Sequence, residues 1–127
     1  MSTSAQYAST VRAALGALSA ANTNRDGTGT IVTVLSAGAS GSRIDDIYIV
    51  ATATVTAGVV RLFLHDGTNA RLLSEILVTA TTPSTTVATW SAALLNQGIV
   101  IPTGWSLRAT TNNAETFNVI VTRAGDF

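Results

Sequence analysis

The sequence predicts an all-β protein, a single antiparallel β-sandwich of about eight strands. Its composition, the spacing of its turn signals and the alternation of its apolar residues lead to this prediction. Thr, Ala and Val are the most frequent of its 127 residues, and the β-branched Thr and Val fit a pleated strand better than a helix. A chain of this length forms one domain with its own core. We place the sandwich at residues 19–127, behind an N-terminal arm at residues 1–18.

Turn-forming residues recur at intervals of roughly ten residues along the chain. Gly and Asn adopt positive φ, Asp and Ser form local side-chain turns, and Pro presets the first corner of a turn. Short strands separated by turns at this spacing are typical of a β-sandwich. The signals are Asn24–Gly27, Gly38–Gly41, Ala57–Gly58, Asp66–Gly67, Thr82–Ser84, Asn96–Gly98, Pro102–Gly104 and Asn112–Asn113.

Between these turns, apolar residues alternate with polar ones, as in half-buried strands. Ile47, Ile49 and Val55 fall on one face of their segment, and Tyr48 and Thr52 fall on the other. After residue 30 the turns leave no room for a helix of ordinary length, about 11 residues. Strands are predicted at 30–35, 47–55, 59–64, 71–78, 85–91, 98–101, 105–110 and 117–122.

Two conformations fit the N-terminal arm. A helix is indicated by an apolar stripe behind a capping box formed by Thr3 and Gln6. An extended strand is indicated by alternating apolar residues from 11 to 17, which a turn at Asp26–Gly27 would pair with 30–35 as a hairpin. We favour the extended arm and expect it to contact a neighbouring chain.

Charge is scarce and balanced. Only 11% of the residues are charged, with seven basic residues, all Arg, against seven acidic ones, whereas soluble domains typically have about 25%. This balance gives no electrostatic footprint for nucleic acid or an anionic membrane, and no apolar run reaches the ~18 residues of a membrane span. An uncharged surface suits contact with protein, because few ions must be desolvated. We therefore expect protein partners, with no nucleic acid and no membrane.

The polar residues do not form a recognisable catalytic set. His65 is the only histidine, and at a strand end beside a turn we interpret it as a surface residue. Asp45 and Asp46 are adjacent, so on a regular strand they face opposite sides, and we expect them to solvate the start of the strand. Glu75 and Glu115 are the other two carboxylates that we consider as candidates for a catalytic pair. We predict no catalytic residue and no enzymatic activity.

One segment resembles half of a calcium loop. Asn22–Gly27 places oxygen-bearing side chains at alternate positions before a glycine, but the twelfth position is Thr33 where a bidentate Glu is needed. We interpret the segment as a turn. The absence of cysteine excludes disulfides and Cys-ligated metals, and the glycines at 27, 29, 38 and 41 open no helix that would cradle a phosphate. We predict neither a metal nor a cofactor site.

The two tryptophans are candidates for stacking on sugars. Trp105 alternates with Leu107, which places it in the core, whereas Trp90 lies among Thr89 and Ser91 and is expected to be exposed. An exposed aromatic platform at Trp90 or Tyr48 would support a carbohydrate-binding or hydrolytic β-domain as an alternative function.

Four segments, at residues 19–30, 37–41, 60–67 and 102–111, have a recognisable pattern. Over roughly residues 19 to 123, the chain resembles a family of small structural virion proteins of tailed bacteriophages and prophages. The resemblance implies a jelly-roll-like sandwich in the virion, assembled in the bacterial cytoplasm. It also implies a capsid decoration (cement) protein that bridges subunits of the major capsid protein, as a homo-oligomer for which we favour a trimer. A tail, baseplate or fibre-associated subunit is the alternative virion position.

Overall fold

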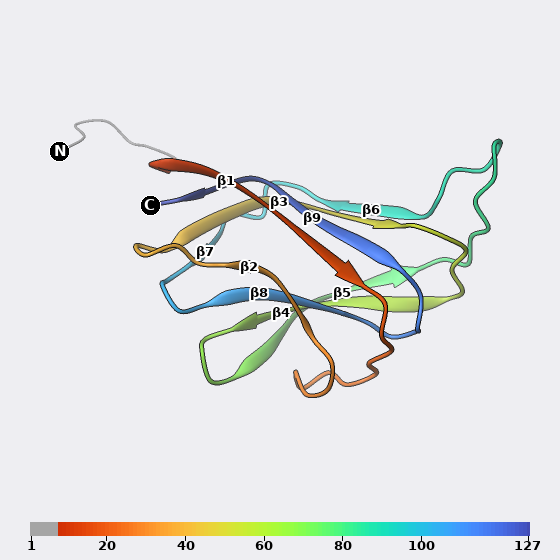
Figure 1. The fold of residues 1–127 in the computed structure, drawn as a ribbon, viewed down its shortest axis with the longest axis horizontal. Helices are drawn as coiled ribbons and strands as arrows, with labels where there is room; N and C mark the ends of the chain where they lie inside the picture. The colour runs from red at the N-terminus through yellow and green to blue at the C-terminus, as the bar shows by residue number, and fades with distance from the viewer. Residues whose placement is uncertain (1–7) are drawn as a thin grey trace.

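The computed structural model describes residues 8–127 and consists of two antiparallel β-sheets packed face to face (Figure 1). It contains nine strands, and residues 8–127 include no helix. The predicted all-β antiparallel sandwich is therefore confirmed. The predictions based on Thr3, Gln6 and Tyr7 lie outside the described residues.

The first sheet has five strands, in the order β1-β9-β3-β6, with β7 also paired to β3. β6 covers one end of β3 and β7 covers the other, so this edge of the sheet consists of two short strands joined by the loop 95–98. The strands are β1 (Thr10–Leu18), β3 (Ser42–Ala51), β6 (Ser91–Leu94), β7 (Ile99–Ile101) and β9 (Phe117–Asp126).

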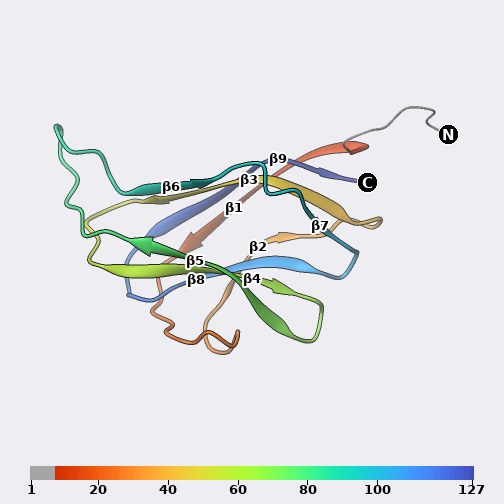
Figure 2. The same ribbon diagram turned by 180° about the vertical axis from the view of Figure 1, so that it is seen from behind.

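The second sheet has four strands, in the order β2-β8-β4-β5. Most connections cross from one sheet to the other, and only β4 to β5 and β6 to β7 stay within a sheet. This alternation of the chain between the two layers is typical of an antiparallel β-sandwich, and Figure 2 shows both layers from behind. The strands are β2 (Val32–Ser36), β4 (Gly58–His65), β5 (Ala70–Val78) and β8 (Ser106–Thr111).

The core fills the space between the sheets. Because successive side chains of a strand point to opposite faces, Ile47 and Ile49 of β3 and Val60 and Leu62 of β4 all point inward and are buried. Burying an aliphatic side chain of this size stabilises the fold by about 1.5–3 kcal/mol. The same alternation leaves a second set of side chains on the outer face of each sheet.

The part of the N-terminal arm that the structure describes is extended from Thr10 to Leu18, but the predicted hairpin is wrong. β1 pairs along its length with β9, from Thr10 opposite Asp126 to Leu18 opposite Phe117. β2 lies in the other sheet and packs across from β1, with Val34 close to Gly16. The loop between β1 and β2 is long enough to cross between the sheets, so its turn signal does not make a hairpin. Residues 10–18 are thus an edge strand of the sandwich.

The strand predicted at 85–91 is also wrong, because β6 starts only at Ser91. The Ser84 hydroxyl oxygen accepts hydrogen bonds from the backbone N–H groups of Thr86, at 3.2 Å, and Val87, at 3.1 Å. Such local side-chain bonds compete with strand pairing, and they turn this Thr-rich segment into a loop.

Candidate interaction surface

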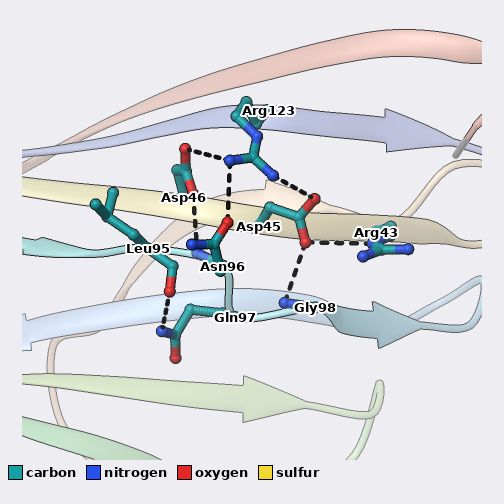
Figure 3. A network of polar contacts seen from close by, with 8 residues as sticks. All are labelled: Arg43, Asp45, Asp46, Leu95, Asn96, Gln97, Gly98 and Arg123. Atoms are coloured by element: carbon teal, nitrogen blue, oxygen red, sulfur yellow. Dashed lines mark hydrogen bonds and ion pairs between the residues drawn. The ribbon is translucent and has the colours of Figure 1, made fainter.

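Asp45 and Asp46 are buried, which corrects the expectation that they solvate the start of a strand. Both carboxylates face the guanidinium of Arg123, each with an N–O distance of 3.5 Å (Figure 3). Arg43 contacts Asp45 from the same strand, at 3.2 Å. Adjacent residues share this cluster because the sheet is irregular here.

The irregularity is a bulge in β9. Between Arg12 and Ala14 of β1, the register with β9 shifts by one residue, and Arg123 has a φ of +47°. A bulge inserts an extra residue into a strand and redirects a side chain. It directs the Arg123 guanidinium over β3, where the two carboxylates lie.

The same cluster holds the loop between β6 and β7. The backbone N–H of Asn96 donates to Asp46 at 3.0 Å, and the N–H of Gly98 donates to Asp45 at 3.1 Å. The Asn96 side-chain oxygen accepts a hydrogen bond from Arg123 at 3.1 Å. The cluster therefore has a structural role: each carboxylate binds groups of this chain, and together they fix the loop between β6 and β7.

The segment that resembles half of a calcium loop is closed by an amide. The buried Asn22 side chain donates from Nδ2 to the carbonyl oxygens of Thr28, at 2.9 Å, and Thr30, at 2.8 Å, and its oxygen accepts the N–H of Asn24. Gly29 has a φ of +86°, and a Cβ there would lie 2.9 Å from the Asn22 nitrogen. A donor nitrogen thus lies where a cation would need oxygen.

This loop also covers part of the outer face of the four-stranded sheet. The Arg61 side chain is buried there and donates to Glu75 at 2.7 Å, and Arg25 of the loop reaches the same carboxylate at 2.9 Å. These hydrogen bonds, from Arg25 first and then Arg61, lower the pKa of Glu75. One outer face of the sandwich thus has a covering segment.

The other predicted polar residues bind groups of this chain. His65 accepts the N–H of Gly67 on Nδ1 at 3.0 Å, within its own turn. Glu115 accepts the N–H and the hydroxyl of Thr56. Among residues 8–127, no three His, Asp or Glu side chains lie close enough together to hold a metal ion.

Trp90 packs against the core, which corrects its expected exposure. It is half-buried and meets the ring of Phe117 edge-on, with ring centroids 5.8 Å apart. Trp105 is half-buried as well and packs against the same core. Tyr48, by contrast, is on the outer face of β3 and is 37% exposed.

The outer face of the five-stranded sheet is apolar along β1. Val11 is 93% exposed and Leu15 is 78% exposed, and Ala13 and Ala17 are exposed between and beyond them. Leu15 lies opposite Ile120 of β9, which lies opposite Tyr48 of β3, so an apolar row crosses three strands. Alternation identified these residues in the sequence, but it did not reveal that they face solvent.

Two hollows lie along the seam between β1 and β9. The first, of about 270 Å³, is lined by Leu15, Gly16, Ala17, Asn118 and Ile120. The second, of about 340 Å³, is lined by Val11, Arg12, Arg123 and Ala124. The exposed outer side chains of β1, namely Val11, Ala13, Leu15 and Ala17, together with Ile120 and Tyr48, are called the apolar face below.

Residues 8–127 contain no helix long and apolar enough to cross a membrane. No family model and no curated protein sequence matches the chain. Two structures of a pentameric capsid protein isolated from metagenomic phage sequences are similar over 78% of this chain, with 16% identity and a TM-score of 0.39. The chain spans 60% and 58% of the length of these two structures.

A structure of CapF with the inhibitor 3-isopropenyl-tropolone is similar over 78% of this chain and 25% of its own, with 10% identity and a TM-score of 0.26. At TM-scores below 0.5, these likenesses establish neither a shared fold nor a shared function.

Proposed function

We propose that this chain is a structural virion protein of a tailed bacteriophage, a capsid decoration protein without enzymatic activity. In this role it binds assembled capsid subunits through the apolar face and bridges neighbouring subunits. The bridge resists the expansion pressure of the packaged genome. A rigid sandwich whose polar clusters all bind groups of the chain itself suits this purely mechanical role.

The observation that carries the proposal is the exposure of Val11 and Leu15. Large apolar side chains exposed together on one face mark interaction sites, and burying each against a partner is worth about 1.5–3 kcal/mol. A loop held by Arg25 and Asn22 covers part of the opposite sheet and leaves Leu77 exposed at its edge. No segment within residues 8–127 covers any part of the apolar face. A protein partner supplies the missing cover.

The virion setting is supported by the resemblance of four sequence segments to small phage structural proteins. It also agrees with the 11% of charged residues, because a surface with few charges is desolvated at low cost when it packs against protein. We propose a homo-oligomer as the assembled form. Three-fold symmetry would suit the local three-fold positions of a capsid, and closed symmetry is the common form of soluble oligomers.

The test is the number of copies in purified particles of a phage that encodes this chain. Quantitative mass spectrometry should find on the order of hundreds of copies per particle, in a fixed ratio to the major capsid protein. Leu15→Lys should be lost from the particles. Leu77→Lys should be retained, because Leu77 is equally exposed, at 80%, but lies on the other sheet.

A count of a few to dozens of copies would instead place the chain in the tail, baseplate or fibres. Absence from the particle would overturn the virion role altogether. Binding of the purified protein to emptied capsids gives the second readout, and it should saturate in the wild type and in Leu77→Lys only.

A further inference from the structure

We propose that β1 pairs edge to edge with β1 of a second copy, antiparallel and about a two-fold axis. The two five-stranded sheets then join into one continuous sheet. The inference rests on the proposed function only in placing the dimer on a virion. The pairing itself is a property of the purified chain.

The edges of the two sheets differ in how well they are protected against pairing with another strand. An edge strand presents unpaired N–H and C=O groups, and proteins protect such edges by keeping them short, charged, bulged or covered. β2 has five residues, and the opposite edge of the first sheet is divided into β6 and β7, with four and three. β5 has nine residues, but Arg71 and Glu75 are exposed on it, and its register with β4 shifts between Leu62 and Phe63.

β1 lacks most of these protections. It has nine residues without Pro, Asp, Glu or Lys. Its one charge, Arg12, is half-buried and ion-paired with Asp126 at 2.9 Å. The register shift between Arg12 and Ala14 comes from the bulge in β9, so β1 itself has no extra residue. Among residues 8–127, it is the only long edge strand whose outward side chains are all apolar from residue 11 to 17.

The side chains of β1 complement those of an inverted copy. In the antiparallel register centred on Ala14, Val11 of one copy lies opposite Ala17 of the other, and Leu15 lies opposite Ala13. Each large outward side chain therefore meets a small one, and directly opposed pairs are the units that stabilise a sheet. Arg12 lies opposite Gly16, so like charges do not oppose each other. This self-complementarity favours a second copy over an unrelated partner.

The size of the contact predicts a weak dimer. A strand of nine residues is about 30 Å long, so the buried area is at the low end of specific interfaces, where weak and transient contacts are found. We therefore expect a weak dimer, with a Kd in the micromolar range or above. If copies are held side by side on a particle surface, as the proposed function requires, their effective concentration is raised, which favours such a pair. The contact is isologous, so it gives dimers alone and hexamers if combined with a three-fold contact.

The experiment is sedimentation equilibrium of the full chain over a concentration series from about 5 to 500 μM, a span around the expected Kd. The wild type should pass from monomer to dimer, or from trimer to hexamer. Leu15→Lys should weaken this step at least tenfold, because an edge lysine blocks strand pairing. Leu77→Lys is the matched control and should associate as the wild type does. Val11→Lys gives an independent second variant at the more exposed position.

Hydrogen exchange identifies the edge itself. Alternate backbone amides between residues 11 and 17 should gain protection as the concentration rises, while those of β5 stay unchanged. A chain that is monomeric throughout, or an oligomer whose mass both lysine variants in β1 leave unchanged, overturns the inference. A chain that dimerises through β1 but is absent from virions overturns only the proposed function.

Discussion

Asp45 and Arg123 meet across β3 and β9 at the one place where β9 bulges, with Oδ2 of the aspartate 3.5 Å from Nη2 of the arginine (Figure 3). The bulge puts Arg123 at a φ of +47°, a conformation that costs a residue with a side chain about 1–2 kcal/mol. Its ion pairs with Asp45 and Asp46 offset this cost. The backbone strain and the buried carboxylates thus depend on each other.

Arg123→Ala should lower the free energy of unfolding by about 1–2 kcal/mol. The loss is limited because the Arg123 side chain is 58% exposed and because Asp45 retains its ion pair with Arg43. Arg123→Gly should lose about 0.5–1 kcal/mol less than Arg123→Ala, because glycine adopts positive φ without strain. Urea unfolding of both variants measures the difference. Equal losses would show that the backbone at residue 123 relaxes once the arginine is gone.

Asn22→Asp should cost about 2–4 kcal/mol, because a carboxylate would replace the nitrogen that donates to Thr28 and Thr30 and would face two carbonyl oxygens in a buried site. Asn24→Asp, at an exposed position of the same loop, is the control and should cost less than about 1 kcal/mol. Thermal unfolding with and without millimolar calcium measures both effects. Calcium should leave the Tm of the wild type unchanged, and a clear rise would contradict the amide-closed loop.

The stability of the protein should fall in acid through Asp126. A hydrogen bond from Ser42 at 2.5 Å and one from Arg12 at 2.9 Å hold the pKa of this carboxyl below its usual value of 3.8. A carboxyl whose pKa is lower in the folded state stabilises the protein at every pH above its pKa in the unfolded state. This stabilisation is lost as the pH falls through the pKa of the folded state. Asp126→Asn should therefore flatten the decline of the urea midpoint below about pH 4.

Ser42→Ala removes the hydrogen bond that lowers the pKa of Asp126 most. It should also make the urea midpoint fall less steeply in acid. The double variant should change little beyond Asp126→Asn alone, because the two residues share one interaction. An unchanged slope in both single variants would mean that Asp126 does not contribute to acid unfolding. Asp26, Asp66 and Glu75 have lowered pKa values too, so some decline should remain.

Trp90→Ala should cost about 2–4 kcal/mol, because it removes a large side chain that packs edge-on against Phe117. Tyr48→Ala on the outer face should cost less than about 1 kcal/mol. Guanidinium unfolding followed by circular dichroism measures both. A stable Trp90→Ala variant with lost binding to a glycan would instead support the carbohydrate-binding alternative.

Much of the fold could be predicted from the sequence because its signals are local. Turn residues such as Asp66–Gly67 and the period-two pattern of Ile47 and Ile49 depend on neighbours along the chain, and they located most of the strands. The exception at 85–91 is also local, because the Ser84 side chain bonds to the backbone ahead of it. β-Branched composition alone does not distinguish such a loop from a strand.

The candidate surface depended on partners far away in the chain. Alternation in residues 11–17 is the same whether the apolar side faces the core or solvent. Pairing with β9 turns the other side of β1 toward Val32 and Val34 of β2 and leaves Val11 and Leu15 outside. Asp45 and Asp46 looked like surface residues until a bulge about 80 residues later brought Arg123 over them. Local chemistry along the chain sets which segments are strands, whereas sheet order and register decide which side of each strand meets the core.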